Sequence, residues 1–220
     1  MNAFLTLITP PGDGEESDWD DEVVRALSLE ETMLHLRAVT GDIQQNLISD
    51  VVDAATQGID GGNGWLGRAL LTQTWKLTLD GFPCDRITIP LPPLQSITSI
   101  KYLDSDGVQQ TWNSANYRVV NADPAYVEPV TGQSWPTTAC KDASVEVQFV
   151  CGYGDKPKDI PALIRQYIKK RVGDFYQNAE TLVIGTSAAE LPYIGTILDN
   201  FRVLGALHAG GKKRSDYQGL

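Results

Sequence analysis

The stretch from Leu66 to Pro83 constrains the fold more than any other part of this chain. Polar and mainly apolar residues alternate along it, with a period of two that is typical of a strand with one buried face and one solvated face. An Asp-Gly-Phe-Pro sequence at its end predicts that the strand stops there. The polar positions are Thr72, Thr74, Lys76 and Thr78, and the others are Gln73, Trp75, Leu77 and Leu79.

Two helices are predicted before this strand. Ser28 and Glu31 have the spacing of a capping box, in which the hydroxyl accepts from an early backbone N–H and the glutamate returns to the cap. Gly41 and Asp42 predict a break and a second helix, and so short a break favours two antiparallel neighbours. The expected buried positions are Leu29, Met33 and Leu36 in the first helix, and Ile43, Leu47, Val51 and Ala55 in the second, with Ile48 and Val52 alongside.

Residues 71–151 have the pattern of several short strands. Asp104-Ser-Asp-Gly107 predicts a tight hairpin between Ile100–Leu103 and Val108–Trp112. Further strands are expected at 86–90, 97–103, 117–121, 125–130 and 144–151. The last is the clearest, because Val145, Val147, Phe149 and Cys151 would share one face. Turns at this spacing favour an antiparallel sheet or a small sandwich.

The chain then returns to helical periodicity. Asp159 is expected to cap a helix that has Pro161 in its first turn, where the missing N–H costs nothing. Its apolar stripe is predicted to be buried, with Arg165, Lys169 and Lys170 facing water. Pro192 is expected to open a last helix. The stripe comprises Ile160, Ile164, Tyr167, Ile168, Val172 and Phe175.

Together these patterns predict an α+β fold: a helical body of two N-terminal and two C-terminal helices with an inserted antiparallel β-sheet or small sandwich. We expect five segments along the chain, which are an acidic N-terminal lead-in at 1–27, a helical pair at 28–70, a β-rich insertion at 71–152, helices completing the body at 155–204, and a flexible basic tail at 205–220.

Composition narrows the classes of function. The net charge of −10 disfavours a protein that grips nucleic-acid phosphates with a basic face. No run approaches the 18 or more apolar residues of a membrane span, and the N-terminus lacks the basic region of a signal peptide. The three cysteines, Cys84, Cys140 and Cys151, have neither a disulfide framework nor zinc-ligand spacing, so we expect reduced thiols in a chain made in the cytoplasm.

No motif predicts a catalytic, cofactor-binding or metal-binding site. Gly62–Gly67 has the glycines of a phosphate loop, but Arg68 and Ala69 stand where lysine and a hydroxyl residue are needed. Asp104 and Asp106 lack the remaining ligands of a calcium loop. Neither histidine has a plausible nucleophile and orienting acid beside it.

The chain does resemble a known family, the head-tail connector (adaptor) proteins of tailed phages and gene transfer agents. The resemblance begins with Ser28–Glu31 and His35–Arg37, and runs through the Leu66–Pro83 stretch. Later pieces follow in the family's order as far as about residue 204. These are Leu91–Ile100, Tyr117–Val119, Gly152–Gly154, Ile160–Gln166 and Gly185–Pro192.

The resemblance implies a non-enzymatic structural protein of the virion neck, at the head-tail junction. It implies a ring of twelve copies beneath the portal that extends the DNA channel. Its expected partners are the portal protein, a head-completion (stopper) or neck protein, other copies of itself, and DNA that passes without sequence-specific binding. No membrane and no cofactor are expected.

In such adaptors the C-terminal segment reaches the portal, which implies that the same segment docks here. Apolar and aromatic side chains would anchor it, and three basic residues would complement an acidic partner. The predicted portal-docking residues are Phe201, Arg202, Leu204, Leu207, Lys212, Lys213, Arg214 and Tyr217.

Two alternatives stay open at this point. One is a head-completion or stopper ring of the same neck. The other, from a different class, is a phage-encoded enzyme or small-ligand-binding domain, which would need a convergent polar pocket that the sequence does not indicate.

Overall fold

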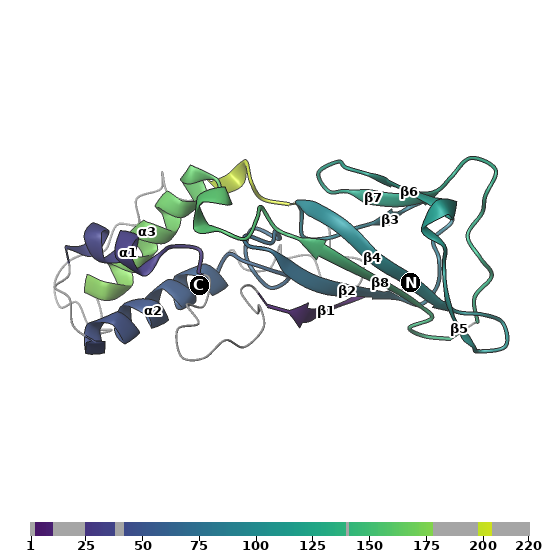
Figure 1. The fold of residues 1–220 in the computed structure, drawn as a ribbon, viewed down its shortest axis with the longest axis horizontal. Coiled ribbons are helices and arrows are strands. Elements are labelled where there is room, and N and C mark those ends of the chain that lie inside the picture. The colour runs from purple at the N-terminus through teal and green to yellow at the C-terminus, as the bar shows by residue number, and fades with distance from the viewer. Residues whose placement is uncertain (1–2, 11–24, 38–41, 140, 178–197, 204–220) are drawn as a thin grey trace, which may run out of the picture. The chain divides into compact units, whose positions relative to one another are not determined.

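A computed structural model describes residues 3–10, 25–37, 42–139, 141–177 and 198–203. The chain divides into two compact units (Figure 1). The described parts of Met1–Pro10 and Gln73–Gly152, with Val203, form the sheet unit. The described parts of Pro11–Thr72 and Tyr153–Arg202 form the helical unit.

A five-stranded antiparallel sheet is the centre of the sheet unit. Its strand order is β1-β2-β8-β4-β5, with β1 at Ala3–Thr9, β2 at Gln73–Leu79, β8 at Val145–Cys151, β4 at Leu94–Leu103 and β5 at Gln109–Thr111. The central strand β8 alternates as predicted, with Val145, Val147, Phe149 and Cys151 completely buried. Burial of each such apolar side chain contributes about 1.5–3 kcal/mol.

The strand β1 was not predicted. The sequence predicts only an acidic lead-in over residues 1–27, yet Ala3–Thr9 pairs with β2, with Leu5 opposite Leu77. Its sequence, AFLTLIT, follows the period of two only in part, because Leu7 and Ile8 are consecutive apolar residues beside an irregularity in the pairing. Residues 3–9 therefore form a strand because they pair with β2, which lies far away in the sequence.

A second antiparallel sheet has the order β3-β7-β6, with β3 at Ile87–Thr88, β7 at Tyr126–Pro129 and β6 at Tyr117–Val120. A short 3₁₀ turn, η1 at Ser114–Asn116, precedes β6. The predicted strand pair at 117–121 and 125–130 is therefore confirmed, whereas the strand expected at 86–90 is shortened to two residues. Ile87 and Val127 are opposite each other in the pairing and are both buried.

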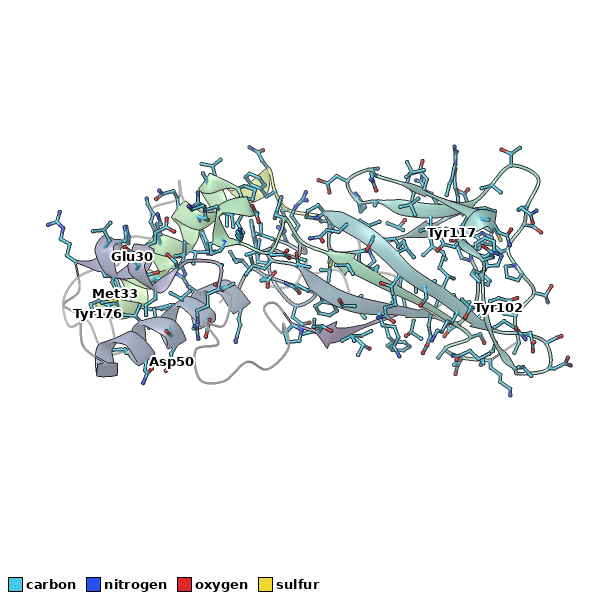
Figure 2. All side chains as sticks on the ribbon, in the orientation of Figure 1. Glu30, Met33, Asp50, Tyr102, Tyr117 and Tyr176 are labelled. Atoms are coloured by element: carbon cyan, nitrogen blue, oxygen red, sulfur yellow. The ribbon has the colours of Figure 1, made fainter. Side chains whose placement is uncertain are left out.

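An aromatic cluster fills one end of the sheet unit. Phe82 stacks on Trp135 with ring centroids 4.8 Å apart, and Trp112 lies 4.9 Å from Trp135 and 5.3 Å from Tyr117. Tyr102 at the end of β4 completes the cluster, with its ring centroid 5.7 Å from that of Phe82, and Figure 2 labels both Tyr102 and Tyr117. Burial raises the pKa of the Tyr117 hydroxyl. Rings from five separate segments thus tie the loops around both sheets.

The described part of the helical unit contains the helices α1 at Leu29–Leu36, α2 at Asp42–Gln57 and α3 at Ala162–Gln177. Their core contains Ile48 and Val52 of α2 with Ile164 and Ile168 of α3. Met33 of α1 and Tyr176 of α3, both labelled in Figure 2, pack against it with Leu29 and Leu36. The predicted stripes of α1 and α3 are therefore largely confirmed.

Two details of the predicted stripes are wrong. Leu47 is 50% exposed, whereas Ile48, Val52 and Ala55 of α2 are buried and Val51 packs against the core. Phe175 near the end of α3 is also exposed. A four-residue repeat drifts around a helix of 3.6 residues per turn, so the sequence alone offers two neighbouring rows.

The predicted cap at Asp159 is displaced as well. Pro157–Asp159 is a separate 3₁₀ turn, η2, and the Asp159 carboxylate accepts from the Lys156 backbone N–H at 3.0 Å. The helix α3 begins only at Ala162, so Asp159 stabilises the preceding turn instead of the helix itself.

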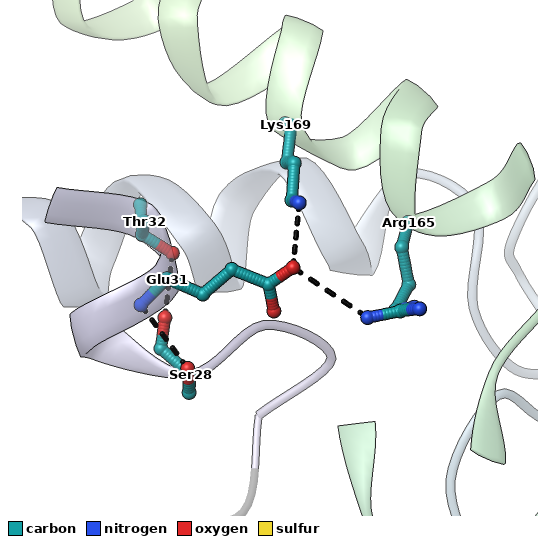
Figure 3. Close-up of polar contacts among 5 residues, drawn as sticks. All are labelled: Ser28, Glu31, Thr32, Arg165 and Lys169. Carbon is teal, nitrogen blue, oxygen red and sulfur yellow. Dashed lines mark hydrogen bonds and ion pairs between the residues drawn. The ribbon is translucent and has the colours of Figure 1, made fainter. Parts of the chain in front are cut away.

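Glu31 links α1 to α3 instead of completing the predicted capping box. Ser28 Oγ does accept from the Glu31 N–H at 3.2 Å, but the Glu31 carboxylate turns towards α3 (Figure 3). There its Oε1 lies 2.5 Å from Lys169 Nζ and 3.5 Å from Arg165 Nη1. These two basic side chains, expected to face water, are both largely covered.

The predicted α+β class with an antiparallel sheet is confirmed. The predicted last helix lies mostly outside the described residues, so a body of four helices stays a prediction. A sandwich arrangement and the five-segment organisation also stay predictions.

The substitution Glu31→Gln is expected to lower the free energy of unfolding by about 1 kcal/mol, because it leaves two partly buried cations facing each other. Glu30→Gln is the matched control, since Glu30 is exposed and lies in the same helical turn. Urea unfolding at low salt measures both. Equal stability of the two variants would contradict the Glu31 bridge.

The β4–β5 hairpin predicts a pH effect. Asp104 accepts from Gln110 Nε2 at 2.9 Å and from the backbone N–H groups of Val108 and Asp106, and these bonds, the Gln110 bond first, hold its pKa below the ordinary 3.8. Stabilisation by the ionised carboxylate is therefore present above the ordinary pKa and is lost as the pH falls through the lower folded value.

An NMR titration of the Asp104 carboxyl measures this pKa directly. Gln110→Ala should raise it towards 3.8, because the largest stabilising bond is removed, whereas Gln109→Ala at the neighbouring exposed position should leave it unchanged. An unchanged pKa in Gln110→Ala would show that the side-chain bond does not hold the hairpin.

Candidate interaction surface

The structure places two of the eight predicted docking residues. Phe201 and Arg202 lie in the helical unit, at the end of the last described segment. The remaining predicted residues, Leu204, Leu207, Lys212, Lys213, Arg214 and Tyr217, lie outside the described residues.

Residues 198–202 form a turn that is anchored from both sides. Leu198 is buried in the helical core, and Phe201 packs against that core while its N–H donates to the Leu198 carbonyl at 2.9 Å. The exposed Arg202 places its guanidinium 4.7 Å from the centroid of the Trp65 ring, in a cation–π contact. Phe201 therefore packs partly against the core of its own subunit, whereas Arg202 is more accessible to a partner protein.

The loop after α2 supports this turn. The helix ends at Gln57, and the Trp65 N–H donates to the Gly58 carbonyl at 3.0 Å. At Gly64 an added Cβ would lie 2.3 Å from the Asp60 carbonyl oxygen, so only glycine fits there. Because several amides of this loop donate to the chain's own carbonyls, they do not form a phosphate cradle. These amides belong to Gly61, Gly64, Trp65, Leu66 and Gly67.

Arg68 connects the loop with the turn. Its side chain is only 8% exposed, and its Nε donates to the Phe201 backbone carbonyl. A hydrogen bond from a charged donor to a partly buried carbonyl is strong, worth about 1.5–3 kcal/mol. The arginine that replaces the lysine of a phosphate loop therefore has a structural task here.

A hollow of about 400 Å³ opens beside Trp65 in the helical unit. Arg171 lies at its margin with its guanidinium 5.0 Å from the Phe175 ring centroid. The described residues that line it are mainly aromatic and aliphatic, with Tyr167 and Arg171 as the polar side chains. Such a hollow suits an apolar side chain. Its lining is Ala54, Ala55, Gly58, Ile59, Trp65, Tyr167, Arg171, Phe175 and Leu198.

Within the described part of the chain, no three histidine, cysteine or acidic side chains are placed to hold a metal ion. Cys84 is exposed, and the buried Cys151 thiol lies 3.8 Å from the Gln73 carbonyl oxygen, while Cys140 lies outside the described residues. No helix found in the described ranges has the length and hydrophobicity required to cross a membrane.

Comparison with solved structures finds the same fold in particle necks. The chain matches one from the neck of an empty gene transfer agent (GTA) particle computed with C6 symmetry, with a TM-score of 0.70 and 22% identity over 96% of this chain and 100% of the other. A chain from the virion of a native GTA particle matches with a TM-score of 0.68 and 22% identity, over 94% of this chain and 98% of the other. A chain from the neck of a native GTA particle computed with C12 symmetry matches with a TM-score of 0.63 and 19% identity, over 96% of this chain and 100% of the other.

No protein-family profile and no curated protein matches the chain. At these identities the structural matches show a shared fold. They span nearly the whole of each chain, so both units are included in the likeness.

Two features of this surface were missed in the sequence. No sequence motif assigns a role to Trp65, and Arg68 stands out only as a departure from a phosphate-binding motif. Their partners, Arg202 and Phe201, lie more than 130 positions away, and no local pattern links residues across such a distance.

Proposed function

We propose that this protein is a structural component of the virion neck of a tailed phage or gene transfer agent, and that it is the head-tail adaptor. The supporting observation is the near-complete coverage in both directions of chains from GTA necks. The sequence pieces from Ser28 to Pro192, which resemble adaptors in the family's order, also support it.

The proposed adaptor is a ring of twelve subunits beneath the portal that extends the DNA channel and links the head to the neck and tail. The matched chains of this fold come from GTA necks that were computed with C6 and with C12 symmetry, which supports a cyclic assembly. The net charge of −10 suits a channel through which DNA passes, because like charge prevents the duplex from adhering to the wall.

The proposed role is structural instead of catalytic. The hollow beside Trp65 is lined by aromatic and aliphatic groups and one arginine, a composition that fits contact with another protein better than turnover of a substrate.

Docking to the portal is proposed to use the C-terminal segment. Arg202 stacks on Trp65 at the surface of the helical unit, and the chain continues from there towards Leu204, Leu207 and Tyr217. Lys212, Lys213 and Arg214 supply three positive charges to this acidic protein, complementary to an acidic surface on the portal.

A head-completion or stopper ring is the second candidate, since a neck contains more than one ring and the matched structures are described only as necks or virions. The order of assembly separates the two functions. An adaptor binds the portal directly, whereas a stopper requires the adaptor to be in place.

Electron microscopy of the purified protein mixed with purified portal tests the function. We expect a ring on the portal, with the isolated subunit largely monomeric, because the net charge of −10 on each subunit opposes spontaneous packing. Bovine serum albumin in place of this protein is the negative control. Binding to portal only in the presence of another neck protein would instead identify a stopper, and no binding under either condition would contradict a neck role.

Truncation after Leu204 tests the docking segment. The shortened subunit should retain its circular dichroism spectrum and unfolding midpoint, because the helical core residues lie before residue 204. It should fail to join portal-bearing heads in a sedimentation assay. The triple substitution of Lys212, Lys213 and Arg214 by alanine should weaken joining in a salt-dependent manner. Full assembly by the truncated subunit would show that the tail is not the docking element.

A further inference from the structure

The strand β1 has an open edge with unusual side chains. It pairs with β2 on one side, and no strand among the described residues pairs on the other (Figure 1). Three of its apolar residues are accessible to solvent: Phe4 is 59% exposed, Ile8 44% and Leu7 42%. The register places Phe4 opposite Thr78 and Leu7 opposite Trp75, so apolar groups project from both faces at this edge.

Exposed strand edges normally carry features that prevent further pairing, such as charged residues or proline within the strand. The strand β1 has the sequence AFLTLIT, with no charge and no proline, and Pro10 follows only after it ends. The one irregularity in its pairing lies between Leu7 and Thr9, which leaves Ala3–Leu7 regular. This edge is therefore chemically suited to accept another strand.

The opposite edge of the same sheet, at β5, is also open among the described residues and uncharged. The strand β5 pairs only with β4 in the described structure, and Gln109, Gln110 and Thr111 are all exposed and uncharged. Val108 beside it is 55% exposed. The charged residues of this sheet lie instead on inner strands, where Lys76 of β2 and Glu146 of β8 form an ion pair at 3.1 Å.

We propose that a second copy of this chain occupies the open edge of β1, and that it does so with its β5 edge. The inference rests on the ring of the proposed function and names the surface by which neighbouring subunits meet. Unpaired backbone groups on both edges supply the hydrogen bonds, and Phe4, Leu7 and Ile8 lose their exposure to water against the neighbour.

The topology fixes the direction of this pairing. Each neighbouring pair in the order β1-β2-β8-β4-β5 is antiparallel, so β1 and β5 run in the same direction. Where neighbouring copies keep this shared sense, β5 of one copy meets β1 of the next as a parallel pair. The β1–β5 contact is therefore parallel and heterologous, the kind of contact that closes a ring by repetition.

A cysteine crosslinking experiment on assembled particles tests the contact. In a background of Cys84→Ser and Cys140→Ser, Thr6→Cys is combined in one chain with Gln109→Cys or with Thr111→Cys, and particles are treated with a short bismaleimide. We expect a ladder of covalent multimers from a double variant and only monomer from each single variant.

The outcomes separate this inference from the proposed function. Rings visible in the particles without a ladder in either double variant would overturn the β1–β5 contact and leave the adaptor role intact. Dimers from Thr6→Cys alone would overturn it in favour of two-fold pairing between β1 strands. Particles whose necks lack the protein altogether would overturn both proposals.

A charge placed on the edge provides an independent readout. Thr6→Lys should reduce ring formation on the portal by about tenfold or more, because it introduces the charge that open edges usually carry. Thr98→Lys, at an exposed position on the inner strand β4, is the matched control. The unfolding midpoint of each purified subunit shows whether it folds. Normal ring formation by a folded Thr6→Lys subunit would overturn the proposal.

Discussion

The antiparallel pairing of β2 with β8 is the interaction on which the rest of the structure depends. These strands lie seventy residues apart in the chain, and their register runs from Leu79 opposite Val145 to Gln73 opposite Cys151. Just beyond its end, the Tyr153 N–H donates to the Leu70 carbonyl and the Thr72 N–H to the Gly154 carbonyl. One ladder thus orders the sheet and brings together the two halves of the helical unit.

The helical unit depends on that closure because neither half has a core of its own. The helix α2 contributes Ile48 and Val52, whereas Ile164 and Ile168 arrive only after the whole sheet has been traversed. Polar links cross between the same halves, as Glu31 meets Arg165 and Lys169, and Arg68 meets the carbonyl of Phe201. Contacts between such distant segments are closed late and cooperatively, since the loop entropy must be lost first.

The two units offer different surfaces for the neck role we propose. The helical unit presents Arg202 on Trp65 and an apolar hollow beside it, which suits the docking of a peptide-like segment of another protein. The sheet unit presents two uncharged edges, which suit repetition of the same subunit. A ring protein needs both kinds of contact, because it must bind its own copies laterally and different proteins above and below.

The sequence by itself determined the elements whose residues are set by local periodicity: α1 with its cap at Ser28, the buried alternation of β8, and the β4–β5 hairpin at Asp104–Gly107. It also indicated the adaptor resemblance and the absence of a catalytic motif. Only the tertiary structure decided that Ala3–Thr9 is a strand, that Glu31 turns to α3, and that Arg68 holds the Phe201 carbonyl. The physical reason is distance along the chain: periodicity reports which face of an element is buried, but the partner that covers that face is chosen by contacts between residues far apart in sequence.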